Sequence, residues 1–135
     1  MVLESVNFHF WPKCNFKCKY CFARFENYGP TLAKKECLNL IELLGESGAK
    51  KINFAGGEPT LNPFLGELII FSKELGLTTS IISNGTGINE TFIENYREYI
   101  DWIGLSIDSG FESTNKKLGR GNGNLVHDIQ KKLRS

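Results

Sequence analysis

The stretch WPKCNFKCKYCFA, residues 11–23, places three cysteines within eight residues. Cys14, Cys18 and Cys21 have the spacing C-x3-C-x2-C, and the fourth cysteine of the chain, Cys37, lies further along the sequence. Thiolates this close together are typical ligands of iron–sulfur clusters and of zinc. Because a four-ligand centre with three cysteines keeps one position open, the stretch predicts a metal centre that can bind an exogenous ligand.

The spacing alone leaves three interpretations open. A 4Fe–4S cluster held by three thiolates has a fourth iron free for an exogenous ligand. A zinc site would need a histidine as its fourth ligand, for which His9 and His127 are the candidates, although zinc ribbons normally have a second ligand pair. The third interpretation is a set of unligated thiols. Cys37 falls on the apolar side of a predicted helix, so we expect a buried free thiol there.

The composition is that of an ordinary globular chain. Of its 135 residues, 41% are hydrophobic and 23% are charged, and the net charge is +1. A charge so near neutral gives no global attraction to nucleic acid or to an anionic membrane. No stretch is apolar over the roughly 18 residues of a membrane helix, and no signal peptide is evident. We therefore expect a cytoplasmic protein with no nucleic-acid partner and no membrane segment, in which clustered cysteines bind metal rather than form disulfides.

Hydrophobic patterning alternates between strand and helix signals along the chain. The predicted strands are residues 5–11, 50–55, 78–83 and 101–108. The predicted helices are residues 31–46, a segment capped by Asn62 with Pro63 at its first position, a segment capped by Asn89, and residues 124–134. The order is (βα)4, which predicts an α/β fold with parallel strands and helices outside.

The two faces of the predicted sheet differ in polarity. One face is apolar in the first, second and fourth strands, with Val6, Phe8, Phe10, Ile52, Phe54, Ile103, Leu105 and Ile107. The other face carries Asn7, His9, Lys51, Asn53, Ser106 and Asp108. A parallel sheet covered on both sides would be apolar on both, so this pattern predicts a partial (βα) barrel with a polar interior. Ligands of such folds bind at the C-terminal ends of the strands, which is where the cysteine stretch and the segments GGEP, SNG and DSG fall.

These features resemble the radical SAM superfamily, whose signature is C-x3-C-x2-C with an aromatic residue, here Tyr20, before the last cysteine. The resemblance narrows to viperin-like nucleotide dehydratases and covers nearly the whole chain. The segments that carry it are SVNFHFWPKCNFKCKYCF (5–22), KKINFAGGEPTLNPFLGELIIFSKE (50–74), SIISNGTGI (80–88), YIDWIGLSIDS (99–109) and LGRGNG (118–123).

The resemblance implies a 4Fe–4S cluster on Cys14, Cys18 and Cys21 whose open iron binds S-adenosylmethionine (SAM). It further implies reductive cleavage of SAM to a 5′-deoxyadenosyl radical. That radical would start the dehydration of a nucleoside triphosphate (CTP, UTP or GTP) to its 3′-deoxy-3′,4′-didehydro form, a chain terminator in antiviral defence. An electron donor of the flavodoxin or ferredoxin type is the implied redox partner.

Single residues also receive roles from the resemblance. Gly56, Gly57 and Glu58 match the stretch whose backbone receives the SAM amino group, and Ala55 stands where relatives often have a serine. The other residues that match SAM contacts are Tyr20, Asn84, Ser106 and Arg120, of which Arg120 matches an arginine that pairs with the SAM carboxylate. The residues that match positions beside the nucleotide are Asn7, His9 and Lys51, with His9 and Lys51 as the catalytic candidates.

Simpler interpretations of four of these polar residues stay open. Asn84 with Gly85 is a turn sequence, and Asp108 is a suitable helix cap. Lys51 can extend to the rim of its strand, and Arg120 can belong to a surface loop.

The family pattern predicts more βα units than the four found here, and in relatives the later units hold the triphosphate. We therefore expect residues 1–135 to be the N-terminal portion of a radical SAM core domain, completed by further sequence or by a second chain. Two alternative functions remain: a different radical SAM enzyme or activase acting on a peptide or small molecule, and a truncated, non-catalytic cluster-binding protein.

Overall fold

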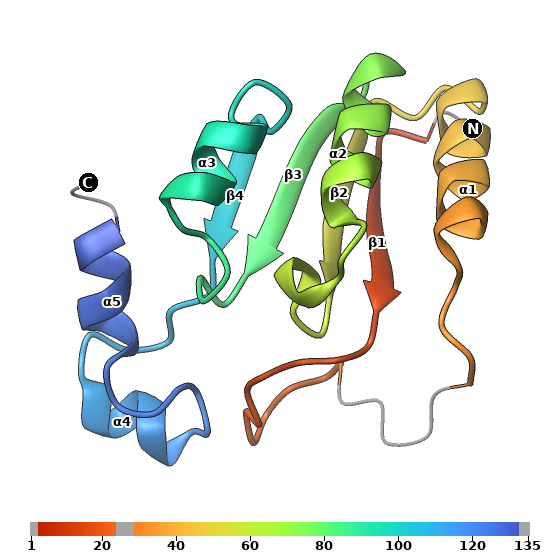
Figure 1. Ribbon diagram of the computed structural model, residues 1–135. Helices are drawn as coiled ribbons and strands as arrows, with labels where there is room; N and C mark the ends of the chain where they lie inside the picture. The colour runs from red at the N-terminus through yellow and green to blue at the C-terminus, as the bar shows by residue number, and fades with distance from the viewer. Residues whose placement is uncertain (1–2, 24–28, 133–135) are drawn as a thin grey trace.

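The four strands form one parallel sheet in a computed structural model of the chain, which describes residues 3–23 and 29–132. They lie side by side in chain order (Figure 1) and are β1 (Ser5–Trp11), β2 (Lys51–Gly56), β3 (Thr78–Ser83) and β4 (Trp102–Leu105). The register places Asn53 of β2 between Asn7 of β1 and Ser80 of β3. The predicted α/β fold with parallel strands is confirmed.

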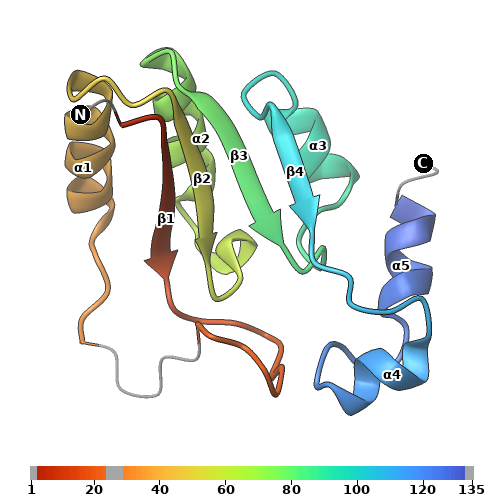
Figure 2. The ribbon, with the colours of Figure 1, turned by 180° about the vertical axis from the view of Figure 1, so that it is seen from behind.

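Helices cover one face of this sheet. The covering helices are α1 (Lys34–Glu46), α2 (Leu65–Glu74) and α3 (Glu90–Tyr96) (Figure 1). Seen from behind, the opposite face is bare of helices in the described part of the chain (Figure 2). A short 3-10 helix, η1 (Pro59–Leu61), precedes α2, while α4 (Glu112–Lys117) and α5 (Leu125–Lys132) follow β4. No helix among the described residues is long and apolar enough to span a bilayer.

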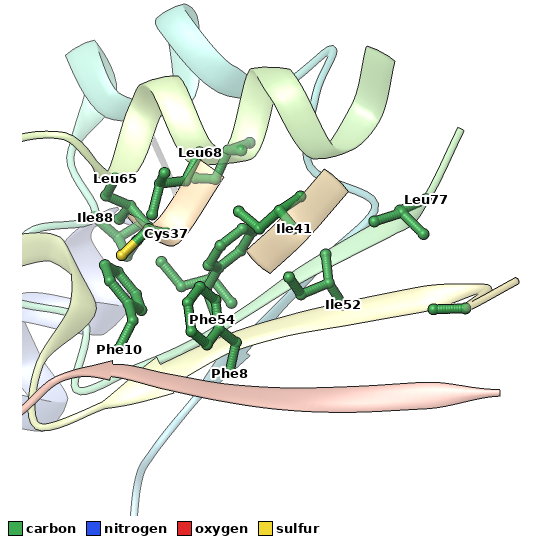
Figure 3. Packing of buried hydrophobic residues seen from close by; sticks show 13 residues of the cluster. Phe8, Phe10, Cys37, Ile41, Ile52, Phe54, Leu65, Leu68, Leu77 and Ile88 are labelled. Carbon is green, nitrogen blue, oxygen red and sulfur yellow. The ribbon is translucent and has the colours of Figure 1, made fainter. Parts of the chain in front are cut away.

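The core lies between the sheet and these helices. Phe54 of β2 packs against Phe8 and Phe10 of β1, with ring centroids 6.3 and 5.8 Å away (Figure 3). The helices add buried side chains, among them Cys37, Ile41, Leu65, Leu68 and Ile69. Burial of a large apolar side chain stabilises the fold by about 1.5–3 kcal/mol, so this layer fixes the sheet that carries the loops. Cys37 is the buried free thiol that its helical position predicts.

Three element boundaries differ from the prediction by more than one residue. The fourth strand ends at Leu105 rather than at residue 108, because beyond it the Ser106 carbonyl accepts a hydrogen bond from Arg120 instead of from a strand. Helix α2 begins at Leu65, since Asn62 Oδ1 accepts the Phe64 N–H at 2.8 Å and forms a turn before the helix.

Helix α1 starts at Lys34, where the Glu36 carboxylate accepts the Ala33 N–H at 2.7 Å. The cap predicted at Asn89 is confirmed, because its Oδ1 accepts the Phe92 N–H at 2.9 Å. Helix α4 is not among the predicted elements, and its sequence ESTNKK shows no apolar periodicity. The last predicted helix is α5, and residues 133 and 134 of that prediction lie outside the described residues.

An ion pair at the N-terminal end of β4 makes stability depend on pH. Lys73 Nζ lies 2.6 Å from Asp101 Oδ1, and the Thr79 N–H donates to Oδ2 at 2.8 Å. Hydrogen bonding from Lys73 is the largest cause that lowers the pKa of Asp101 below its usual 3.8. A lowered folded-state pKa stabilises the fold at pH above the unfolded value, and this contribution is lost as the pH falls through the folded value.

We therefore expect Asp101→Asn to reduce the free energy of unfolding at pH 7. The reduction should be about 1 kcal/mol or less, because the two side chains are 34% and 31% exposed. Urea unfolding followed by circular dichroism measures it, and the gap between variant and wild type should narrow as the pH is lowered from about 7 toward 3. A gap that does not change with pH would contradict this account.

Candidate metal and cofactor site

The loops that follow the strands meet at the C-terminal edge of the sheet (Figures 1 and 2). The cysteine loop is tied to the loop after α4, because the N–H groups of Lys17 and Lys19 donate to the carbonyls of Gly119 and Leu118 at 3.2 and 2.9 Å. It is tied on its other side to the GGE loop, where the Glu58 N–H donates to the Lys13 carbonyl at 2.8 Å. Backbone hydrogen bonds therefore hold three separate loops together around the cysteines.

Glycine is required where these loops touch. A Cβ atom on Gly57 would overlap the carbonyl oxygens of Lys13 and Pro12, and a Cβ atom on Gly119 would overlap that of Lys17. Gly56 has a φ of 144°, a conformation that L residues with a side chain rarely adopt. The GG pair therefore allows β2 to turn directly beneath the cysteine loop.

The three thiols of the cysteine loop lie near one another. Burial raises the pKa of the Cys14 thiol, and the Phe16 N–H opposes this by donating to Cys14 Sγ at 3.4 Å. Burial also raises the pKa of Cys18, and the Arg120 guanidinium opposes that rise. The negative charge of Cys21 adds to both shifts. The N–H donor and the nearby cation offset part of the rise and stabilise the thiolate, which is the form that binds iron, so this donor set fits an iron–sulfur cluster.

The two histidines considered as zinc ligands lie on different elements. His9 is on the open face of β1, where its ring packs edge-on against Phe22 with centroids 5.9 Å apart. His127 is on α5. In residues 3–23 and 29–132, no three His, Cys, Asp or Glu side chains converge on one metal ion. A cluster has a different requirement, because each thiolate binds an iron of its own.

Glu58 is a buried hub beneath the site. Its side chain is 1% exposed, and its Oε1 accepts the hydroxyls of Ser83 and Thr60 at 2.7 and 2.5 Å. Its Oε2 accepts the Asn84 N–H at 2.7 Å. The family resemblance gives a role to the backbone of Glu58 but none to its side chain. The carboxylate in fact joins the GGE loop to the SNG loop that follows β3.

Asn84 continues this network toward the cysteines. Its Nδ2 donates to Asn15 Oδ1 at 2.8 Å, and Asn15 Nδ2 donates to Thr86 Oγ1 at 3.0 Å. The turn interpretation holds, since Gly85 has a φ of 84° and Asn84 Oδ1 accepts the Thr86 N–H at 2.9 Å. The same side chain also fastens the SNG loop to the cysteine loop.

Arg120 is held inside a polar cluster. Its Nε and Nη2 donate to the Tyr20 hydroxyl at 3.1 and 2.9 Å, and its Nη1 donates to the Ser106 carbonyl at 3.3 Å. Asp108 forms an ion pair with the guanidinium, and the Arg120 side chain is 11% exposed. The surface-loop interpretation of Arg120 is therefore wrong. The helix-cap interpretation of Asp108 is wrong as well, because α4 begins at Glu112.

The open face of the sheet is polar on β1 and β2, as predicted, whereas Ile82 of β3 and Trp102 of β4 are apolar and 47% and 68% exposed. Ser80 Oγ donates to Asn53 Oδ1 at 2.9 Å, and Asn53 Nδ2 donates to Asn7 Oδ1 at 2.9 Å. This row of hydrogen bonds crosses three strands. Asn53 belongs to the predicted polar face, although nothing in the sequence gives it a role. The ambiguous pattern of the third strand gives no signal for Ser80.

The predicted site residues thus fall into two groups. One group gathers at the C-terminal edge of the sheet: Cys14, Cys18, Tyr20, Cys21, Gly56, Gly57, Glu58, Asn84, Ser106 and Arg120. The other group, Asn7, His9 and Lys51, is spread along the open face. Lys51 begins β2 and is roughly 17 Å from the GGE loop by the rise of a strand.

The sequence model that describes the radical SAM superfamily matches residues 8–134 of this chain. The chain belongs to this superfamily. An S-adenosylmethionine-dependent nucleotide dehydratase of Flammeovirga pacifica is 46% identical over 132 residues, which cover 93% of this chain and 45% of that protein. The S-adenosylmethionine-dependent nucleotide dehydratase RSAD2 of Danio rerio is 42% identical over 129 residues, which cover 92% of this chain and 36% of that protein. The chain spans less than half the length of these curated relatives.

Solved structures of radical SAM enzymes share the fold. Streptococcus suis SuiB bound to S-adenosylmethionine aligns with a TM-score of 0.78 at 22% identity, over 96% of this chain and 31% of that chain. The anSMEcpe structure with bound AdoMet aligns with a TM-score of 0.75 at 22% identity, over 98% of this chain and 40% of that chain. Radical SAM enzymes use a 4Fe–4S cluster and SAM, which are the cofactors that the sequence predicts.

Proposed function

We propose that this chain carries the cluster-binding and SAM-binding part of a nucleotide dehydratase. The observation that carries the proposal is the set of three neighbouring thiols fastened to the GGE loop at the C-terminal edge of the sheet. Identities of 41–46% to proteins named S-adenosylmethionine-dependent nucleotide dehydratases support the reaction class. Cys14, Cys18 and Cys21 are the cluster ligands. A cluster bound there would supply one electron for reductive cleavage of SAM to methionine and a 5′-deoxyadenosyl radical.

The loops at the same edge bind SAM. The Gly57 N–H donates to the Trp11 carbonyl, and the Glu58 N–H donates to the Lys13 carbonyl. Because these N–H groups are engaged with the cysteine loop, the GGE loop has its carbonyl oxygens to offer to the SAM amino group. Arg120 donates to the SAM carboxylate, a pairing that suits its forked geometry. The remaining contacts with ribose, methionine and adenine come from Asn84, Ser106 and Tyr20.

The open face holds the substrate, a nucleoside triphosphate such as CTP, UTP or GTP. Asn7, His9 and Lys51 supply it with hydrogen-bond donors and a cation, and His9 and Lys51 are the candidates for proton transfer. The product is the 3′-deoxy-3′,4′-didehydro nucleotide, which acts in antiviral defence. An electron donor of the flavodoxin or ferredoxin type reduces the cluster.

Residues 1–135 form the N-terminal portion of the core domain, and further βα units complete the site. Two observations support this. The chain covers less than half the length of its relatives, and Trp102 of β4 is 68% exposed at the edge of the sheet. The further units belong to the same protein or to a second chain. All four cysteines are free thiols, which is the usual state of cysteines in the reducing cytoplasm.

The proposal is tested by anaerobic loading of the chain with iron and sulfide, followed by dithionite and SAM. Chromatography measures 5′-deoxyadenosine and didehydro-nucleotide with CTP, UTP and GTP in turn. The chain is assayed alone and after fusion to the C-terminal remainder of the Flammeovirga pacifica relative. We expect SAM cleavage by both forms and a nucleotide-dependent increase in the fusion. No cleavage by either form would refute the cofactor assignment, and cleavage that no nucleotide increases would refute the substrate.

A further inference from the structure

Arg120 is occupied along one edge of its guanidinium. Nε and Nη2 share the Tyr20 hydroxyl oxygen, and Asp108 contacts Nε. Nη1 uses one N–H for the Ser106 carbonyl. A guanidinium has five N–H bonds, so one N–H on Nη1 and one on Nη2 remain without a partner in the described residues. Nη1 and Nη2 are the two nitrogens at the end of the guanidinium fork, where a pair of N–H groups receives a carboxylate side by side.

The Tyr20 hydroxyl is itself oriented. Its single hydrogen is donated to Asp108, which leaves the oxygen lone pairs for the two nitrogens of Arg120. The arrangement is therefore directional, because the carboxylate orients the hydroxyl and the hydroxyl then holds the guanidinium. Tyr20 is 50% exposed, but the ion pair between Arg120 and Asp108 is partly withdrawn from solvent, with side chains that are 11% and 29% exposed. A contact of this kind is stronger than the same contact on the surface.

We propose that Tyr20 and Asp108 are positioning residues that keep the free end of Arg120 available for the carboxylate of SAM. The inference rests on the proposed function, gives Tyr20 a second role beside its contact with SAM, and adds Asp108. Tyr20 directly precedes the cluster ligand Cys21, and the Gly119 carbonyl beside Arg120 accepts the Lys17 N–H. Arg120, which binds the SAM carboxylate, is therefore fixed to the loop that binds the cluster.

The opposite role for Asp108 is also chemically sensible and predicts the opposite sign. Asp108 carries a carboxylate, as SAM does, and it already pairs with Arg120. If it occupied the place of the SAM carboxylate, its removal would tighten SAM binding. In a positioning role its removal weakens binding, because the guanidinium loses the contact that fixes its orientation.

The positioning step is tested first on the chain without cluster or SAM. In a nitrogen-labelled sample, the Arg120 Nε–H signal, assigned by its loss in Arg120→Lys, should exchange slowly with water. Exchange should become at least tenfold faster in Tyr20→Phe and Asp108→Asn. Arg97, which is 70% exposed, gives the fast reference within the same sample. An Arg120 signal that exchanges as fast as that of Arg97 in the wild type would overturn the proposal.

The binding step uses equilibrium dialysis of labelled SAM against the anaerobically loaded, oxidised chain. We expect SAM to bind about tenfold more weakly to Asp108→Asn and about fivefold more weakly to Tyr20→Phe. The matched control is Asp101→Asn, which removes an ion pair at the other end of β4 and should leave affinity within about twofold. Unchanged affinity in both site variants, or tighter binding by Asp108→Asn, would overturn the positioning role. A wild type that binds no SAM would overturn the proposed function, while the exchange measurement still decides whether Tyr20 and Asp108 hold Arg120.

Discussion

Replacing Cys14, Cys18 or Cys21 by alanine is expected to abolish assembly of the 4Fe–4S cluster. Each thiolate holds a different iron, and no other cysteine lies in this loop to replace one that is lost. The measurement is anaerobic reconstitution followed by iron and sulfide analysis and by the brown absorbance that dithionite bleaches. The wild-type chain should bind about four irons and four sulfides, and each of the three variants should lose both the metal and the colour.

Cys37→Ala is the matched control for these variants. Its thiol is 0% exposed and packs in the core behind the covered face of the sheet. Its loss should cost about 1 kcal/mol or less of stability through a small cavity and leave cluster loading unchanged. If the wild type instead retained one tightly bound zinc through anaerobic iron loading, the cluster assignment would be refuted.

The location of the site was predictable from the sequence because parallel strands place their loops at one edge. Alternating polarity in β1, β2 and β4 assigns Asn7 and Lys51 to one face, and that face is opposite the one on which Phe8 and Ile52 join the core. The third strand, TTSIIS, has no clear alternation. Only the packed structure distinguishes Ile81, which is 0% exposed, from Ile82, which is 47% exposed.

The connections within the site were not predictable, because they join residues far apart in the chain. Tyr20 and Arg120 are 100 positions apart, and neither lies in a periodic pattern that points to the other. Burial of an acidic side chain also runs against the usual preference for exposure, so the sequence contains no signal that Glu58 is internal. Its role becomes visible only when the donors from the neighbouring loops are placed around it.

Substitution of Glu58 is expected to have the largest effect on the stability of the fold around the site. The carboxylate is 1% exposed and accepts hydrogen bonds from the backbone and hydroxyl of Thr60, the hydroxyl of Ser83 and the backbone of Asn84. In Glu58→Gln, one oxygen becomes an NH2 group, which must then face the N–H of Thr60 or of Asn84. Because a backbone N–H cannot turn into an acceptor, a buried donor is left unsatisfied, at a cost of about 2–3 kcal/mol.

Urea unfolding of the chain measures this cost, with Glu67→Gln as the control. Glu67 carries the same charge but is 58% exposed in its pair with Lys34, so its substitution should change the free energy of unfolding by about 0.5 kcal/mol or less. Glu58→Gln should also reduce cluster loading, because the GGE loop that it steadies donates the Glu58 N–H to the Lys13 carbonyl beside Cys14. A Glu58→Gln variant as stable as Glu67→Gln would show that the loops are held by their backbone contacts alone. A loss of about 2–3 kcal/mol would mean that the site depends on the two acceptor oxygens of Glu58, placed where the cysteine, GGE and SNG loops are fastened together.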